Sequence, residues 1–223
     1  MGILVKADNI YTGYSKSEMV LKNASFTLKT KEFVFLTGVS GSGKSTLLKS
    51  IYGELPIIRG SLNLGGIELK NISKSKLSYL RRHIGIVFQD YKLIENWTIL
   101  ENVMLPLLIM RVNRKEAEKE AVKLLSKVKL SHKIDKYPKE LSGGEQQRAA
   151  IARAIIHDPV LVLADEPISG LDDYSANLVM ELFVMANEEK DITVVIATHT
   201  LTNTYNLNYK ELHLEKGTLY ELS

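Results

Sequence analysis

The sequence predicts an α/β protein with a mainly parallel core sheet, an N-terminal antiparallel β layer and a helical insertion. Residues 1 to about 37 alternate apolar and polar residues between turn residues, which is typical of an antiparallel layer. Residues 160–164 and 192–197 are uninterrupted apolar runs, as expected of parallel strands covered on both faces. From roughly Leu77 to Ser131 the apolar residues recur with a helical period instead.

Length and composition narrow the class further. The chain has 223 residues, enough for one large α/β domain. It has no cysteine, which excludes a disulfide framework and thiolate metal sites. Its 29 basic and 26 acidic residues give a net charge of +3, too balanced to indicate nucleic-acid binding.

Nothing in the sequence indicates insertion into a membrane. The N-terminus reaches a charge at Lys6, too early for a secretory segment, and we expect it to form the first strand. The longest apolar stretch is Val103–Met110, far short of the roughly 20 residues that a spanning helix needs.

The first motif follows the apolar run Phe33–Leu36 and fits the phosphate-loop pattern G-x-x-x-x-G-K-[ST]. Glycines let backbone N–H groups wrap phosphates, Lys44 reaches the β- and γ-phosphates, and the Ser45 hydroxyl can ligate Mg²⁺. The alternative is a glycine-rich turn that matches by accident. The motif predicts a bound nucleoside triphosphate, with contacts from Gly38, Ser40, Gly41, Ser42, Gly43, Lys44, Ser45 and Thr46.

A second motif, Leu141–Arg148, opens a helix that runs to Ile156, where Asp158-Pro159 stops it. Ser142, Gly143 and Gly144 fall where the amides of a helix N-terminus are exposed, so they form a second potential anion site. Taken alone, Ser142 could equally be an ordinary N-cap.

Two carboxylates come at the end of the apolar run 160–164. Asp165 falls at the carboxyl edge of the predicted strand, where it can hold Mg²⁺ through water. Glu166 follows directly and can polarise an attacking water. A turn-forming role for Asp165 is the alternative.

Leu141–Arg148 resembles the signature motif of ABC-type ATPases, and five further motifs agree in order and spacing. They are Tyr14 as the adenine-stacking aromatic, Gln89 in Val87-Phe88-Gln89-Asp90 as the Q-loop, Asp165-Glu166-Pro167 as Walker B, Ser169-Gly170-Leu171-Asp172 as the D-loop, and His199 as the switch histidine. The resemblance implies that Glu166 is the catalytic base and that Gln89 contacts Mg²⁺ and the attacking water. It also implies that His199 contacts the γ-phosphate. Tyr11 lies close enough to be an alternative to Tyr14, and Gln89 could be an ordinary solvated side chain.

The resemblance also implies a homodimer that sandwiches ATP, in which residues 142–144 of one chain complete the site built on Lys44 of the other. It implies a single ABC ATPase domain over residues 1–223. Within it, residues 1–88 and 159–223 would form the catalytic core with its β layer, and about 89–158 the helical subdomain.

Three positions depart from the family pattern. Lys31 stands where a glycine is usual, Gly170 where the nearest subgroup usually has asparagine, and Thr200 where aspartate is common. None of these replaces a catalytic group, but Lys31 raises the question of how its turn is formed.

The resemblance further implies what the ATPase drives. Gln89 and Leu141 are only 52 positions apart and the chain holds one cassette, which disfavours the family members that act on DNA ends or in translation. The chain is expected to dock on an integral membrane partner, and so to act as a peripheral subunit at the cytoplasmic face of the bacterial inner membrane. Some residues of Lys92–Met110, including Trp97, would line a groove for a helix of that partner. The nearest subgroup acts in bacterial cell division; a lipoprotein or export transporter, or an ATP-binding scaffold without turnover, are the alternatives.

Overall fold

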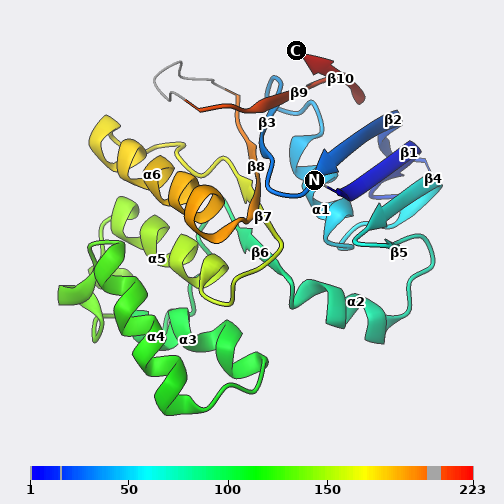
Figure 1. Cartoon of the computed structure of the whole chain (residues 1–223). Coiled ribbons are helices and arrows are strands. Elements are labelled where there is room, and N and C mark those ends of the chain that lie inside the picture. Colours follow the sequence, from blue (N-terminus) through cyan, green and yellow to red (C-terminus); the bar gives the residue numbers. More distant parts are fainter. Residues whose placement is uncertain (1, 16, 200–206, 223) are drawn as a thin grey trace. The chain divides into compact units, whose positions relative to one another are not determined.

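The computed structural model in Figure 1 describes residues 2–15, 17–199 and 207–222. The chain divides into two compact units, one of residues 1–81 with 193–223 and one of residues 82–192. Within the described ranges, no helix has both the length and the apolar character that crossing a membrane requires.

The first unit begins with an antiparallel sheet in the strand order β2-β1-β4-β5. Its strands are β1 (Ile3–Gly13), β2 (Met19–Lys29), β4 (Ile57–Leu64) and β5 (Ile67–Glu68). Val5 of β1 stands opposite Leu28 of β2 and Leu64 of β4, and all three side chains are buried. These cross-strand pairs hold one face of the layer together. The predicted N-terminal β layer is confirmed.

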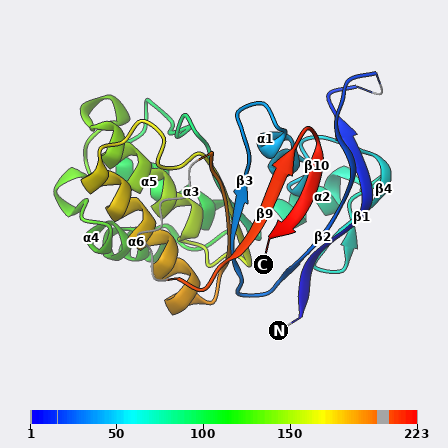
Figure 2. The same ribbon diagram turned by 90° about the horizontal axis from the view of Figure 1, so that it is seen from above.

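A second sheet in this unit is mainly parallel and runs β10-β9-β3-β8. Its strands are β3 (Phe33–Thr37), β8 (Thr193–Ala197), β9 (Lys210–Glu215) and β10 (Thr218–Leu222), and the helices are α1 (Lys44–Ile51) and α2 (Lys74–Arg81). Strand β3 pairs in parallel with both β8 and β9. Strand β10 returns antiparallel to β9 (Figure 2). Strands β3 and β8 are buried along their whole length, which accounts for their continuous apolar sequences.

The turn before β3 forms although Lys31 replaces the usual glycine. Lys31 adopts a left-handed backbone with φ of 67°, and its N–H donates to the Thr193 hydroxyl at 2.9 Å. Val194 N–H donates to the Glu32 carbonyl at 3.0 Å, which ties the same turn to β8. The strain of a lysine in this region is therefore held by hydrogen bonds on both sides of the turn.

The second unit combines two parallel strands with four helices. Its strands are β6 (Ile84–Val87) and β7 (Leu161–Asp165), and its helices are α3 (Ile99–Ile109), α4 (Arg114–Lys127), α5 (Gly143–Ile155) and α6 (Asp173–Lys190), with short 3₁₀ turns at Ser131–Lys133 and Pro138–Glu140. The predicted helical period from Leu77 to Ser131 is wrong at β6, because this short apolar segment pairs with β7. Periodicity cannot separate a buried strand of this length from a helix segment.

Helix α4 lies in the stretch from Leu77 to Ser131 for which the sequence predicts a helical period, and its Ala117, Ala121 and Leu125 are buried. Asn113 is its N-cap and accepts from the N–H of Lys115 at 3.0 Å. Within the described part of the chain, no return bond from residue 116 completes a capping box. The cap is therefore the simpler single-bond type.

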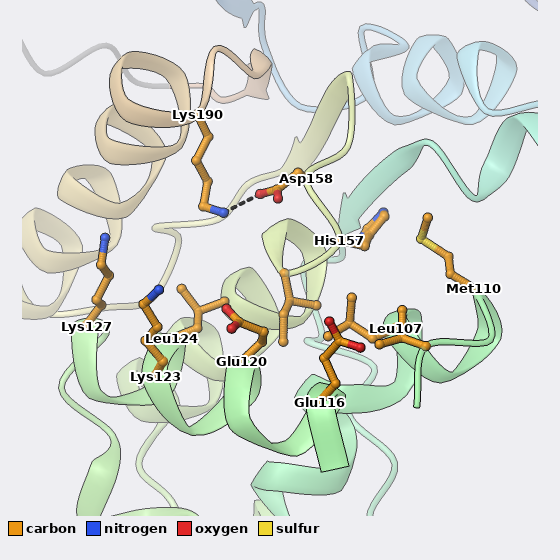
Figure 3. Close-up of a pocket in the computed structure, with 12 residues that line it drawn as sticks. Leu107, Met110, Glu116, Glu120, Lys123, Leu124, Lys127, His157, Asp158 and Lys190 are labelled. Carbon is orange, nitrogen blue, oxygen red and sulfur yellow. Dashed lines mark hydrogen bonds and ion pairs between the residues drawn. The ribbon is translucent and has the colours of Figure 1, made fainter. Parts of the chain in front are cut away.

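A surface cavity of about 340 Å³ lies in the second unit, beside α4, the ends of α3 and α6, and the turn after α5 (Figure 3). Apolar side chains such as Leu107 and Leu124 line it together with the charged side chains of α4. Lys190 at the end of α6 forms an ion pair with Asp158. The cavity is lined by Leu107, Met110, Val112, Glu116, Glu120, Lys123, Leu124, Lys127, Ile156, His157, Asp158 and Lys190.

His157 is the partly buried imidazole of this cavity. Burial lowers the pKa of His157 below its ordinary value of 6.5, helped by the nearby charges of His83 and Lys190 and opposed by Asp158 and a hydrogen bond to the Ile84 backbone. Its Nδ1 atom is buried and has no hydrogen-bond partner among the described residues. Protonation of this ring therefore disfavours the folded state.

We expect His157→Gln to reduce the acid sensitivity of the fold. Because the pKa of His157 is lower in the folded than in the unfolded chain, the unfolded chain binds more protons, and stability falls as the pH decreases from about 7 to 5. The variant should lose less stability over this range. Urea unfolding at three pH values measures the difference. His132→Gln, at a side chain that is 65% exposed, is the control, and an unchanged slope in His157→Gln would contradict the expectation.

Candidate nucleotide site

The loop between β3 and α1 encloses the ammonium group of Lys44. The Lys44 Nζ donates to the Gly38 carbonyl at 2.7 Å and lies 3.4 Å from the Val39 carbonyl, and the residue is only 5% exposed. The positive charge therefore lies inside the loop, beside the first turn of α1. A helix N-terminus with an enclosed ammonium is a strong anion-binding arrangement.

Gly38 is required where it stands. Its φ is 143°, and a Cβ on it would lie 2.2 Å from the carbonyl oxygen of Leu214. Ser42 is buried in the same loop, and its hydroxyl has no hydrogen-bond partner among the described residues, which fits a polar ligand. Of the other predicted contacts, Ser40 and Gly41 are exposed, Ser45 is half-buried, and Gly43 and Thr46 are buried.

The two candidate aromatics differ in their surroundings. Tyr11 is half-buried within β1, and the Arg59 guanidinium lies 5.8 Å from its ring centroid. Tyr14 lies just beyond β1 and is 58% exposed. The ring of Tyr14 is thus the more accessible of the two.

His199 lies beside the phosphate loop because its strand is the neighbour of β3. Leu36 pairs with Ala197, and the N–H of Thr198 donates to the Leu36 carbonyl at 3.0 Å. Gly38 and the exposed His199 therefore leave adjacent strand ends. Thr200, the third departure from the family pattern, lies outside the described residues.

In the second unit, Gln89, Asp165 and Glu166 share the carboxyl edge of the strand pair β6–β7. Val87 pairs with Ala164, so the segments that follow them begin side by side. Gln89 is exposed and the two carboxylate residues are half-buried. Glu166 has a left-handed backbone with φ of 48°, so the chain turns sharply at the second carboxylate. Backbone strain at a residue with a candidate catalytic role is typical of functional sites.

The signature motif begins helix α5 with a reciprocal cap. The Ser142 hydroxyl accepts from the N–H of Glu145 at 3.3 Å, and the Glu145 carboxylate accepts from the N–H of Ser142 at 2.9 Å. Ser142 and Gly143 are exposed and Gly144 is buried. The sequence left open whether Ser142 is a cap or part of an anion site, and the geometry shows that it is at least a cap.

Glu145 stays ionised at the head of this helix. Burial raises the pKa of Glu145, but the hydrogen bond from Ser142 and the charge of Lys133 outweigh it, so the pKa lies below its ordinary value of 4.5. A carboxylate in the first turn also interacts favourably with the helix dipole.

The second signature glycine is fixed by contact with α6. A Cβ on Gly144 would lie 2.7 Å from the Ser175 hydroxyl oxygen, so a side chain there requires a shift of α6 or of Ser175. Ser175 is held by Asp172, which caps α6 by accepting from its N–H at 2.9 Å and its hydroxyl at 2.8 Å. These bonds lower the pKa of Asp172. Gly170 has φ of 75°, a region that asparagine also tolerates, so this departure preserves the backbone of the D-loop.

Arg153 is a residue of this unit that sequence reasoning missed. Its guanidinium donates to the carbonyls of Tyr91 and Lys92, both at 2.7 Å. Burial lowers the pKa of Arg153 to about 10, which leaves it charged at neutral pH. Tyr91 and Lys92 have left-handed backbones with φ of 60° and 48°. One available signal was an arginine inside the apolar segment Ala149–Ile156.

Asn102 completes the same network from α3. It is fully buried, accepts from the N–H of Ile94 at 2.7 Å and donates to the Ile94 and Thr98 carbonyls at 3.0 Å. The segment after Gln89 is thus fixed by side chains of α3 and α5, without regular secondary structure of its own.

These geometries place the chain among phosphate-loop ATPases with a signature helix, and the comparisons agree. A family model described as ABC transporter matches residues 21–169, and the chain belongs to this family. It is 40% identical to the cell division ATP-binding protein FtsE of Haemophilus influenzae, over 97% of this chain and 99% of that protein. It is also 36% identical to the bacitracin export ATP-binding protein BceA of Halalkalibacterium halodurans, over 88% of this chain and 79% of that protein.

A solved structure supports the same class. The dimeric, post-hydrolysis structure of the ATP-binding cassette MJ0796 bound to ADP and Pi has a TM-score of 0.88 and 35% identity, covering 99% of both chains. The predicted fold class is confirmed, and the chain is an ATPase that hydrolyses ATP to ADP and phosphate.

We expect Arg153→Met to destabilise the fold by about 2–4 kcal/mol, because two backbone carbonyls lose hydrogen bonds from a charged donor. Urea unfolding measures the loss. The matched control is Lys127→Met, which breaks an exposed pair with Glu189 and should cost no more than about 1 kcal/mol. Equal effects of the two substitutions would contradict this account.

Proposed function

We propose that this chain is the ATPase subunit of an FtsE-like complex that works with the membrane protein FtsX in bacterial cell division and in the control of cell-wall hydrolases. The observation that carries the proposal is the 40% identity to an FtsE protein over nearly the full length of both chains. The subunit would act at the cytoplasmic face of the inner membrane, without nucleic acid and without inserting into the membrane itself.

The proposed working form is a homodimer with two ATP molecules between the subunits. One chain supplies one phosphate loop and one signature helix. The exposure of Ser142 and Gly143 at the start of a 13-residue helix supports a contact with the nucleotide of the partner subunit. Asp172, beside the signature, would face the same interface.

Each candidate residue that follows a parallel strand has a proposed role. Lys44 and the loop from Gly38 to Thr46 bind the phosphates, Tyr14 stacks on adenine, and His199 contacts the γ-phosphate. Glu166 orients and polarises the attacking water.

Ser45, Gln89 and Asp165 are the proposed ligands of Mg²⁺, directly or through water. A hydroxyl, an amide oxygen and a carboxylate are hard donors that suit this ion. Among the described residues, no cluster of three or more acidic, histidine or cysteine side chains forms a metal cage. Three protein ligands of this kind suit an ion that takes its remaining ligands from phosphate and water. When bound, Mg²⁺ offsets the negative charge of the phosphates.

The energy available from closure suits a mechanical role. Moving an open–closed equilibrium from about 1:99 to 99:1 takes about 5.5 kcal/mol. Two sites that each add one or two charge-assisted hydrogen bonds of about 1.5–3 kcal/mol can supply it. ATP would close the dimer and hydrolysis would release it.

We propose the segment Lys92–Met110 as the surface that meets the membrane partner, within a helical subdomain of about residues 89–158. Residues 1–88 and 159–223 would form the catalytic core. The side chains of Trp97, Ile109 and Met110 are 36%, 50% and 41% exposed, so apolar area is available there.

A LolD-like or MacB-like lipoprotein or export ATPase is the second candidate, favoured by the similarity to BceA. The third candidate is a scaffold that binds ATP without turnover, and only an inactive wild-type complex would support it.

We expect Lys44→Ala to abolish ATP binding, because the charge enclosed by the phosphate loop is lost. Glu166→Gln should bind ATP, dimerise, and hydrolyse ATP about a thousandfold more slowly, because the polarising carboxylate is removed. Nucleotide titration, sedimentation and phosphate release measure the three properties. Lys115→Ala and Glu118→Gln on the exposed face of α4 are the controls. Normal turnover by Glu166→Gln would remove Glu166 from the mechanism.

The membrane partner can be captured directly. Tagged Glu166→Gln is trapped with ATP in native membranes, cross-linked and purified, and the attached membrane subunit is identified by mass spectrometry. An FtsX-like protein is the expected result. A permease of the lipoprotein or export class would overturn the division assignment and leave the nucleotide site unaffected.

A further inference from the structure

Tyr91 lies between the Q-loop and the signature motif of the same chain. It is the second residue after Gln89, and its hydroxyl lies 3.2 Å from the position that a Cβ on Gly143 would occupy. The ring thus reaches from the end of β6 to the first residue of α5. Because Gly143 has no side chain, the tyrosine hydroxyl can lie close to space that a side chain at this position would fill.

The backbone of Tyr91, at the opposite end of the residue from the hydroxyl, is held in place by Arg153. Arg153 donates to its carbonyl at 2.7 Å, and the left-handed φ of 60° persists because this bond and the neighbouring bond to Lys92 hold it. A short, stiff aromatic side chain joins this anchored backbone to Gly143. A displacement of the Tyr91 backbone therefore also displaces the hydroxyl that lies next to the start of α5.

The signature glycines also lie close to the D-loop and to α6. Leu171 of the D-loop lies 3.8 Å from the same Cβ position on Gly143, and Ser175 blocks Gly144. Asp172 holds Ser175 through two hydrogen bonds. Tyr91, which follows the Q-loop, therefore lies next to Gly143, and the D-loop and α6 lie next to both signature glycines.

We propose that Tyr91 is a positioning residue that transmits the position of Gln89 to the signature motif of the same subunit. When Gln89 is drawn toward its ligands, Tyr91 sets where Gly143 stands for the nucleotide of the partner subunit. This inference rests on the proposed ATP-sandwich homodimer. It adds a link between the two sites of the dimer through Tyr91, a residue to which no nucleotide or metal contact is assigned.

The test measures ATP-induced dimerisation in the Glu166→Gln background by sedimentation. Tyr91→Ala should weaken dimerisation by about tenfold or more, while ATP affinity of the monomer stays within about twofold. Tyr91→Phe keeps the ring but lacks the hydroxyl that lies nearest Gly143, so its dimerisation should fall between that of the parent and that of Tyr91→Ala. Tyr79→Ala, at a tyrosine that is 59% exposed on α2, is the control and should change neither property.

A double-mutant cycle separates transmission from support of the fold. If Tyr91 relays the position of Gln89, then Gln89→Ala with Tyr91→Ala should weaken dimerisation no more than the stronger single change. A purely structural tyrosine would give additive losses, together with a lower melting temperature, and would overturn the inference. The cycle is repeated with Tyr91→Leu, whose side chain fills much of the space but is too short to reach Gly143. This second variant keeps the test valid if the alanine variant folds poorly.

The proposed function and this inference fail in different ways. If the Glu166→Gln parent binds ATP but stays monomeric, the sandwich dimer is wrong. If the parent dimerises and Tyr91→Ala dimerises equally well, only the role of Tyr91 is wrong.

Discussion

Parallel strand pairing is the constraint on which the site depends. Where two parallel strands stand in register, the segments that leave them start side by side, and this chain uses the arrangement twice. Leu36 beside Ala197 brings the phosphate loop to His199, and Val87 beside Ala164 brings Gln89 to the two carboxylates. The strands are buried, so packing fixes their register. The fixed register in turn positions the polar residues at the strand ends, and these residues need no contacts with one another to be held in place.

Much of this was readable from the sequence because each feature has a local cause. The phosphate loop follows from the spacing of its glycines and Lys44, and the strands follow from their continuous apolar composition. The cap at Ser142 follows from residue type. Strand β6 was hidden, because Ile84–Val87 is too short for periodicity to separate it from a helix and only its pairing with β7 decides its conformation.

The segment after Gln89 was the part that sequence reasoning could not predict. Tyr91 and Lys92 lack the glycine or proline that usually marks a turn. Their left-handed conformations exist because Arg153, some sixty positions later, donates hydrogen bonds to both of their carbonyls. Asn102 plays the same part from α3. Such long-range hydrogen bonds are set by the packing of α3 and α5, and a single sequence carries no direct record of them.

Lys31 has a consequence for how related sequences should be compared. A left-handed lysine costs about 1–2 kcal/mol relative to glycine in the folded chain, but glycine costs about 0.4–1 kcal/mol more in lost freedom of the unfolded chain. The hydrogen bond from the residue 31 amide to the Thr193 hydroxyl comes from the backbone, so either residue can make it, and the two residues differ in net stability by only about 1 kcal/mol. The turn is therefore close to neutral toward this exchange over evolutionary time. A glycine or a lysine at this position consequently says little about which branch of the family a chain descends from.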